Sequence, residues 1–372
     1  MSAHPDILIV GGGVIGLSCA AYLVRQGAAV ALLDRGDLGQ QASWAGAGII
    51  PPGDPDRAHT PFDRLRAFSS RLFPVLSQEL REQTGLDNGY VVCGGLELPD
   101  PAEEAPTDEW RAEGIAYQEL TAGELRRREP DLAPTVARGY WLPQMAQVRN
   151  PRHVKALIAY CSARGVRLEP NCGVRALVRD GERIVAVETE RGRREAGRFL
   201  LASGAWADQL LEQVGWRPGI HPVRGQIALL NTGREGVRPL LLQGKRYLVP
   251  RTDGRLLAGS TEEDAGFDAR PTAGAIEGLL GFAASLVPSL AGAALERCWA
   301  GLRPGSPDGL PFLGPVPGCD RLFVAGGHFR SGIQLSPATG VLLADLLLDR
   351  PPTLPLDAFR LDRAAAQSAF RS

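Results

Sequence analysis

Three glycines near the start of the chain have the spacing of a phosphate-binding turn. Gly11, Gly13 and Gly16 follow a short apolar run, and Asp34 ends a second apolar run further along. The first glycine of such a turn permits a tight bend, the second lets the backbone approach a pyrophosphate, and the third lets a helix pack on the strand. The N–H groups at the helix start attract the phosphates, and the carboxylate can hold a ribose. The pattern predicts dinucleotide binding, but alone it does not separate FAD from NAD.

Arg303 is a candidate for binding a carboxylate. It lies in the stretch from Ala300 to Asp308, which is rich in glycine and proline and predicts a loop. A guanidinium held in such a place can pair with a carboxylate through two parallel hydrogen bonds. Because the chain has many arginines, a surface position is the alternative.

A glycine-rich segment near the C-terminus predicts a second ligand-facing turn. The apolar run 322–325 enters a loop from Gly326, and Ser336 with Pro337 predicts the start of a helix that ends near Leu348. A helix N-terminus stabilises negative charge. A reduced flavin carries such a charge and a nicotinamide does not, whereas the simpler alternative is a closing strand–helix unit of the fold.

The elements that must position these residues alternate between strand and helix. Apolar runs and helical periodicity predict strands at 6–10, 29–33, 166–169 and 199–204, helices at 14–26, 62–84 and 152–164, and a hairpin of 174–179 with 184–189. Strand-like runs at 221–230, 246–250 and 256–260 are separated by glycine and proline and predict an antiparallel sheet. The small residues of 43–53 suit a close approach of backbone to ligand, or else a flexible loop. The acidic segment 99–109 predicts an exposed loop.

Composition excludes several other classes of protein. The chain has 372 residues, with 41 basic against 42 acidic side chains, so it lacks the positive field that nucleic-acid binding needs. Its histidines and cysteines show no metal-ligand spacing, and we expect no metal. The uncharged stretch 7–24 is broken by glycines and has no basic residues before it, which argues against membrane insertion. Six cysteines without regular spacing favour reduced thiols and a cytoplasmic location.

Taken together, the motifs resemble the D-amino-acid oxidase superfamily of FAD-dependent enzymes, and within it the glycine oxidase branch associated with thiamine biosynthesis. The resemblance spans nearly the whole chain. Besides the first glycine turn, it rests on 45–49, 247–251, 259–262, 300–308 and 327–340. It implies an α/β, Rossmann-like FAD-binding domain (1–85, 145–215 and 300–350), an α+β substrate-binding domain with an antiparallel sheet (86–144 and 216–299) and a C-terminal tail (351–372).

The resemblance also implies which residues form the site. Non-covalent FAD would contact Gly11, Gly13, Val14, Ile15, Gly16, Asp34, Arg35, Ala42, Ser43, Ala47, Gly48, Ile49, Val174, His328, Phe329, Arg330, Ser331, Gly332, Ile333 and Gln334. Arg303 would hold the substrate carboxylate, while Tyr247 and Arg330 would complete the pocket, and the start of the Ser336 helix would offset charge on the reduced flavin. Ile49 and Glu262 stand where better-known members of the superfamily carry methionine.

The implied reaction is oxidative deamination of glycine and other small amino acids or amines, such as sarcosine and small D-amino acids. Molecular oxygen is the expected acceptor, with the imine or 2-oxo acid, ammonia and hydrogen peroxide as products. No dedicated acid or base is required if the amine is neutral. Three alternatives stay open: an FAD-dependent D-amino-acid or secondary-amine dehydrogenase that passes electrons to a quinone or protein, an NAD-dependent dehydrogenase, and a non-catalytic dinucleotide-binding module. The sequence leaves the oligomeric state open, a homo-oligomer included.

Overall fold

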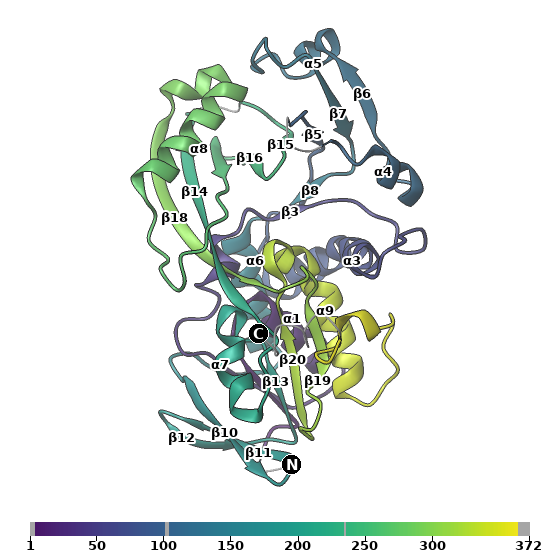
Figure 1. Ribbon diagram of the computed structural model, residues 1–372, viewed down its shortest axis with the longest axis vertical. Helices are drawn as coiled ribbons and strands as arrows, with labels where there is room; N and C mark the ends of the chain where they lie inside the picture. Colours follow the sequence, from purple (N-terminus) through teal and green to yellow (C-terminus); the bar gives the residue numbers. More distant parts are fainter. Residues whose placement is uncertain (1–3, 101–103, 234–235, 364–372) are drawn as a thin grey trace.

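The computed structural model describes residues 4–100, 104–233 and 236–363. A mostly parallel sheet of six strands lies in the lower half of Figure 1, in the order β19-β20-β13-β1-β2-β9. Only β19 runs antiparallel to its neighbour. The strands are β1 (Ile7–Val10), β2 (Val30–Leu33), β9 (Arg167–Glu169), β13 (Arg198–Leu201), β19 (Phe312–Pro315) and β20 (Leu322–Gly326). The short apolar runs of β1, β2 and β13 are completely buried or nearly so, as parallel strands covered on both faces must be.

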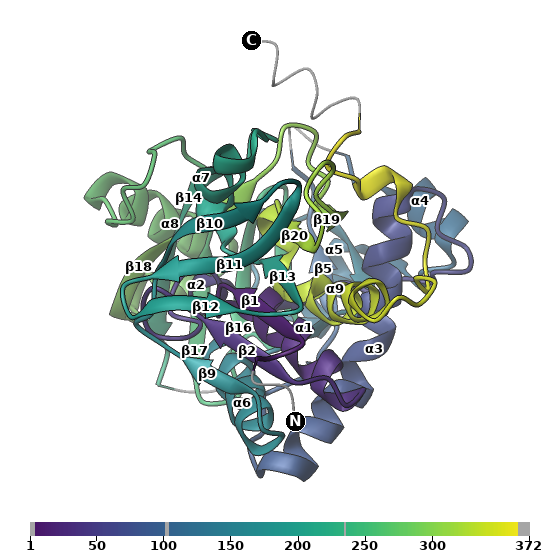
Figure 2. The same cartoon turned by 90° about the horizontal axis from the view of Figure 1, so that it is seen from below.

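Different layers cover the two faces of this sheet. Alternate residues of β1 pack against helices on one face and against a small sheet on the other. The helical layer consists of α1 (Val14–Arg25), α3 (Pro61–Thr84), α6 (Asn150–Ala163) and α9 (Gly332–Leu347). The opposite layer consists of β10 (Val174–Asp180), β11 (Arg183–Thr189), β12 (Gly192–Glu195), η1 (Gly204–Trp206), α7 (Ala207–Leu211) and η2 (Glu212–Val214). Figure 2 views the molecule from the end where this small sheet lies.

A second sheet of eight strands forms the upper half of Figure 1, in the order β18-β14-β17-β16-β15-β5-β7-β6. Its pairs are antiparallel except β15 with β5. The strands are β5 (Gly95–Glu97), β6 (Gln118–Thr121), β7 (Arg138–Leu142), β14 (His221–Asn231), β15 (Leu240–Gln243), β16 (Arg246–Pro250), β17 (Arg255–Gly259) and β18 (Ala294–Gly305). Its helices are α4 (Thr107–Glu113), α5 (Ala122–Arg128), α8 (Ala273–Leu286) and η3 (Pro288–Gly292). α8 buries its apolar face on β14 and β17.

Two kinds of connection join the halves. Small elements lie between the sheets. The small-residue segment carries α2 (Ala42–Ala45) and β3 (Ile49–Ile50), and β3 joins β8 (Ala146–Gln147) and β4 (Val91–Val92) in a short sheet. The long pair β14 and β18 runs from the upper sheet down toward the lower one, where η4 (Phe329–Ser331) precedes α9. The last short helix is η5 (Asp357–Phe359). The division of the chain into domains stays a prediction.

Most predicted elements are confirmed, including the first strand–helix–strand unit, the hairpin across Asp180 and Gly181 and the antiparallel sheet. The predicted loop at 99–109 is wrong at its end, because α4 begins at Thr107; residues 101–103 lie outside the described residues. The predicted loop around Arg303 is also wrong. Arg303 lies within β18, paired with Val223 of β14, so the strand fixes its backbone.

The predicted start of the C-terminal helix at Ser336 is wrong as well. α9 begins at Gly332, directly after η4. Pro337 sits inside the helix, where it has no N–H to bond with the carbonyl of Ile333 one turn back. The Ser336 hydroxyl donates to that same carbonyl at 2.9 Å and takes the place of the missing donor. Ser336 therefore supports the helix interior, and the residues at the helix start are Ser331 and Gly332.

Candidate active site

The first glycine turn opens onto a groove of about 560 Å³ at the carboxyl ends of β1, β2 and β13. Of the predicted cofactor residues, those that line it are Gly11, Gly13, Val14, Ile15, Asp34, Arg35, Ala42, Ser43, Val174, His328, Phe329, Arg330, Gly332 and Ile333. Gly16 does not line the groove: a Cβ there would overlap the carbonyl oxygen of Gly11, so its role is to let α1 pack on β1. The remaining five predicted residues lie in an adjoining cavity described below.

The turn is held in shape by side chains as well as by glycine. Gly11 has a φ of 116°, and a Cβ there would overlap the backbone of Ala202. The Ser43 hydroxyl accepts the first helical N–H, from Val14, at 2.8 Å. The Asp34 carboxylate accepts from Gly12 N at 2.7 Å and from Gly36 N at 2.8 Å, which fixes its position at the edge of the groove. α1 has no acidic residue in its first turn, so nothing there opposes a phosphate.

Ser203 and Trp206 are among the groove residues that were not predicted from the sequence. Ser203 lies opposite the glycine turn, and its buried hydroxyl has no hydrogen-bond partner among the described residues. The Arg35 guanidinium lies 3.6 Å from the centre of the Trp206 ring, which forms part of the groove wall. An orphaned hydroxyl, a glycine cradle and a fixed ribose acceptor are the features that a dinucleotide needs. Only the small-residue stretch that ends at Gly204 could have drawn attention to this wall.

A smaller cavity of about 260 Å³ adjoins the groove, beneath the upper sheet. Both share Ala42, Gly46, Arg303, Arg330 and Ile333 as lining residues, so the two spaces meet at the start of α9. The remaining predicted residues line this cavity: Ala47, Gly48, Ile49, Tyr247, Ser331 and Gln334. The structure therefore brings the three predicted substrate-binding residues, Tyr247, Arg303 and Arg330, to one place.

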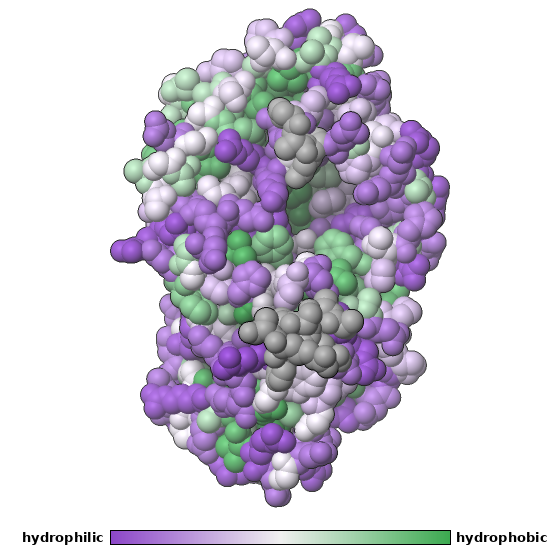
Figure 3. All heavy atoms as spheres, in the orientation of Figure 1, coloured by the Kyte–Doolittle hydropathy of each residue, from purple (hydrophilic) through white to green (hydrophobic). Residues whose placement is uncertain are grey.

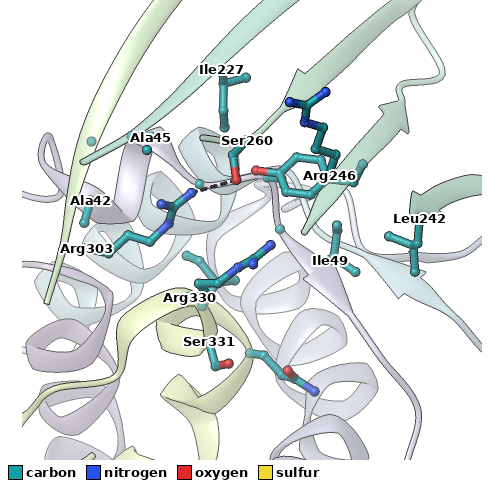
Figure 4. A pocket seen from close by; sticks show the side chains of 18 of the residues that line it. Ala42, Ala45, Ile49, Ile227, Leu242, Arg246, Ser260, Arg303, Arg330 and Ser331 are labelled. Carbon is teal, nitrogen blue, oxygen red and sulfur yellow. Dashed lines mark hydrogen bonds between the residues drawn. The ribbon is translucent and has the colours of Figure 1, made fainter. Parts of the chain in front are cut away.

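Arg303 presents a charge without an acidic partner. Its guanidinium donates to Ser260 Oγ at 2.7 Å (Figure 4) and to Thr261 O at 3.0 Å, both of them neutral acceptors. Within the described part of the chain it forms no ion pair. Burial lowers the pKa of the guanidinium, which still keeps its charge at neutral pH. A half-buried cation whose direct hydrogen-bond partners are neutral, and which has donors to spare, is a binding site for an anion.

Glycines on neighbouring strands make room for the large side chains of the cavity. A Cβ at Gly225 of β14 would overlap the Arg303 guanidinium. Tyr247 of β16 pairs in register with Gly259 of β17, and a Cβ there would lie 2.6 Å from the Tyr247 ring. These two glycines were not predicted as site residues. Their signal is a glycine inside a strand, which marks a close approach of a side chain or ligand.

Arg330 differs from Arg303 because it has an acidic neighbour, which it shares with Lys245. Its guanidinium lies 3.5 Å from Glu262 Oε2 and donates to Lys245 O at 2.8 Å. Glu262 also lies 3.5 Å from Lys245 Nζ, so these three residues form a chain of charges above the cavity. Arg246 lines the same cavity, yet its side chain turns away from the two arginines and lies over Phe282 (Figure 4). Arg303 is therefore the better carboxylate anchor of the three.

His328 is unsuited to proton transfer near neutral pH. It is buried, and its Nε2 lies 3.1 Å from Thr339 Oγ1. Burial lowers its pKa to about 3, so the imidazole stays neutral. Within the described residues, no group of three or more His, Cys, Asp or Glu side chains could hold a metal ion. In the same part of the chain, no helix is long and apolar enough to cross a membrane.

The fold and the groove together define a dinucleotide-binding oxidoreductase of the flavin type. The sequence profile of the FAD dependent oxidoreductase family matches residues 6–346, and the chain belongs to this family. It is an FAD-dependent enzyme, which removes the NAD-dependent and the non-catalytic alternatives.

Known glycine oxidases are similar to this chain over almost its whole length. The glycine oxidase of Pseudomonas aeruginosa is 40% identical over 352 residues, which cover 94% of this chain and 96% of that protein. The crystal structure of glycine oxidase from Geobacillus kaustophilus matches with a TM-score of 0.91 and 35% identity, over 97% of this chain and 99% of that one. The bifunctional protein ThiO/ThiG of Synechocystis is 36% identical over 98% of this chain, which spans 54% of that longer protein.

Proposed function

We propose that this enzyme catalyses the FAD-dependent oxidative deamination of glycine and other small amino acids or amines, such as sarcosine and small D-amino acids. The products are the imine or 2-oxo acid, ammonia and hydrogen peroxide. The observation that carries the proposal is the unpaired guanidinium of Arg303, which lines both the dinucleotide groove and the small cavity beside it. The similarity to named glycine oxidases supports the choice of substrate.

The residues of the groove fit FAD. The N–H groups at the start of α1, at Val14 and Ile15, would face the pyrophosphate, and Asp34 beside Arg35 would hold the ribose. The segments 42–49 and 328–334 would border the flavin ring. When bound, FAD supplies the two-electron oxidation of the amine, while the protein supplies position and electrostatics.

The chain's own residues bind and orient the substrate. Arg303 would hold the carboxylate through the N–H groups that Thr261 O and Ser260 Oγ leave free, and these two acceptors would keep the guanidinium in one orientation. Tyr247 would form a wall of the pocket, and Arg330, restrained by Glu262, would close it above. With the amine neutral, no dedicated acid or base is needed, in agreement with the neutral, buried His328.

Further parts of the proposal concern the setting of the enzyme. The relatives named ThiO/ThiG support a role in supplying thiamine biosynthesis. The free cysteines favour the cytoplasm. We also propose that 1–85, 145–215 and 300–350 bind the cofactor, that 86–144 and 216–299 bind the substrate, and that molecular oxygen is the acceptor.

The test is anaerobic reduction of the purified yellow protein with glycine, sarcosine, D-alanine and D-proline. We expect glycine or sarcosine to bleach the flavin absorbance most efficiently, and exposure to air to restore it with one equivalent of peroxide per turnover. Bleaching without peroxide would favour a dehydrogenase that uses another acceptor. No bleaching by any of the four compounds would overturn the proposal.

A further inference from the structure

The smaller cavity, which holds Tyr247, Arg303 and Arg330 and is called the reaction cavity from here on, opens into a second, larger chamber. This outer chamber has a volume of about 640 Å³, more than twice the 260 Å³ of the reaction cavity. The two share Pro51, Glu97, Leu242 and Gly244 as lining residues, so they are adjoining parts of one space. Figure 3 shows the surface hollowed between the upper and lower halves on the viewed face. A substrate as small as glycine would leave this outer chamber empty.

The lining of the outer chamber is strongly acidic. Its carboxylates come from α3, β5, α4 and the segment before α4: Asp63, Glu97, Glu104, Asp108, Glu109 and Glu113. Arg66 is the single lysine or arginine among its described lining residues, and His59 the single histidine. Arg66 lies 3.3 Å from Asp63 and 2.5 Å from Glu113, and its charge is paired with these two carboxylates. Asp108 in turn pairs with Arg111 at 2.6 Å. The negative charge that the chamber keeps therefore comes mainly from Glu104 and Glu109, which form no ion pair within the described residues.

Glu113 adds a buried carboxyl to the chamber wall. Its side chain is almost completely buried, with only 5% of the residue exposed, and it lines the chamber. One carboxylate oxygen pairs with Arg66, while Oε1 has no hydrogen-bond partner within the described residues. Burial raises the pKa of this carboxyl although Arg66 acts in the opposite direction. A buried acceptor of this kind gains from a further donor.

Arg303 and Glu97 lie at two different junctions of the reaction cavity. Arg303 lies at the inner end of the combined space, where it meets the dinucleotide groove, and Glu97 lies at the junction with the chamber. A molecule with its carboxylate on Arg303 would have its reacting carbon beside the groove. Any arm that continues away from the groove would pass Glu97 into the acidic chamber. A cleft lined with one sign of charge attracts the opposite charge and raises its local concentration.

We propose that the enzyme prefers amino acids that carry a second cationic group on an arm reaching into the outer chamber. The inference rests on the proposed function, since it concerns the substrate of the same site. The arm extends either from the α-carbon, as in a basic D-amino acid, or from the reacting nitrogen, as in an N-(aminoalkyl)glycine. Both share one chemistry: an anchored carboxylate, an oxidisable amine and a distal ammonium or guanidinium.

The experiment compares each cationic compound with a neutral compound of the same length. D-Lysine is paired with D-2-aminoheptanoic acid, and N-(2-aminoethyl)glycine with N-propylglycine. Rates of anaerobic flavin reduction are measured with the holoenzyme at low salt and at 0.5 M salt. We expect a preference of about tenfold or more for the cation in at least one pair at low salt, reduced severalfold at high salt because screening weakens exposed charges. The pair that shows it tells which arm enters the chamber.

A charge-neutral variant tests where the preference arises. Glu104 and Glu109 are exposed at the chamber and form no ion pair within the described residues. Glu104→Gln/Glu109→Gln should lower the preference at least threefold and leave the rate with sarcosine unchanged. The matched control, Glu82→Gln/Glu277→Gln, removes two exposed carboxylates that do not line the chamber and should leave the preference intact.

The outcomes separate this inference from the proposed function. If sarcosine and glycine are oxidised but both cationic compounds react no faster than their neutral partners, the preference is refuted and the chamber is only a water-filled access path. If the preference exists but the control variant lowers it equally, it arises from overall charge and the chamber plays no part. If neither glycine, sarcosine nor any arm-bearing compound reduces the flavin, the proposed function itself is wrong.

Discussion

Removing the Arg303 guanidinium is the sharpest test of the active site. In Arg303→Ala the cavity would lose the one half-buried cation that has no acidic partner among the described residues. Losing one member of a buried, hydrogen-bonded charge pair costs about 2–5 kcal/mol. At about 1.4 kcal/mol per factor of ten, that predicts a fall of about 30-fold to several thousandfold in kcat/KM for glycine. Arg303→Lys keeps the charge but loses the two-pronged geometry, and should fall between the variant and the wild type.

The assay follows kcat/KM for peroxide release or anaerobic flavin reduction, with flavin content checked by absorbance because Arg303 also lines the cofactor groove. Dimethylamine, which is sarcosine without its carboxylate, serves as the matched substrate. Its slow oxidation should change little in Arg303→Ala, since it has no carboxylate to lose contact with. An unchanged KM for glycine, or an equal loss with dimethylamine, would refute the role of Arg303 as the anchor.

Three further predictions concern the cofactor and the fold. Asp34→Ala leaves two backbone N–H groups without their acceptor and removes the proposed ribose acceptor, at a cost of about 1–3 kcal/mol. FAD titration of the apoprotein should therefore show binding weakened by about 5- to 150-fold. Gly16→Ala places a Cβ against the backbone of Gly11 and should lower both thermal stability and flavin content. Gly278→Ala, whose Cβ would lie in open space on α8, should instead raise the free energy of unfolding by about 0.5–1 kcal/mol. Burial lowers the pKa of His153 to about 4, from an ordinary value near 6.5. At a pH between these two values, the unfolded chain binds a proton on this histidine that the folded chain does not. The stability of the wild type relative to His153→Asn, from urea unfolding, should therefore fall by about 2 kcal/mol between pH 7 and pH 5; an unchanged gap would contradict the buried neutral histidine.

The sequence predicted the parts of the fold whose signal is local. The first strand–helix–strand unit could be predicted because glycine spacing, apolar runs and the acid at Asp34 all lie within one stretch of chain. Backbone requirements there are strict, as the close contacts of Gly11 and Gly16 show. The residues gathered in the reaction cavity come from separate segments, and their grouping was predicted from a family resemblance rather than from spacing.

What the sequence could not show depends on contacts between distant segments. Pro337 indicated a helix start because a proline is usual there, but the Ser336 hydroxyl satisfies the carbonyl that the proline cannot reach. Arg303 was assigned to a loop because prolines and glycines surround it, yet pairing with β14 holds that stretch as a strand. Trp206 and Ser203 carry no motif, and only the folded groove brings them to the cofactor side.

The placement of Arg303 on a strand has a mechanistic consequence. A loop arginine could follow its ligand, whereas β18 fixes the backbone of Arg303 through its pairing with β14, and Gly225 leaves only enough room for the guanidinium itself. The same residue borders the dinucleotide groove and the reaction cavity, so one strand would set the positions of both the proposed substrate carboxylate and the flavin. On the proposal made above, specificity would arise beyond the fixed end of the substrate, toward Glu97 and the outer chamber, whose lining includes the exposed side chains of Glu104 and Glu109. Substitutions in that chamber should change which amines are oxidised, whereas substitutions on β18 should change how well every amino acid is oxidised.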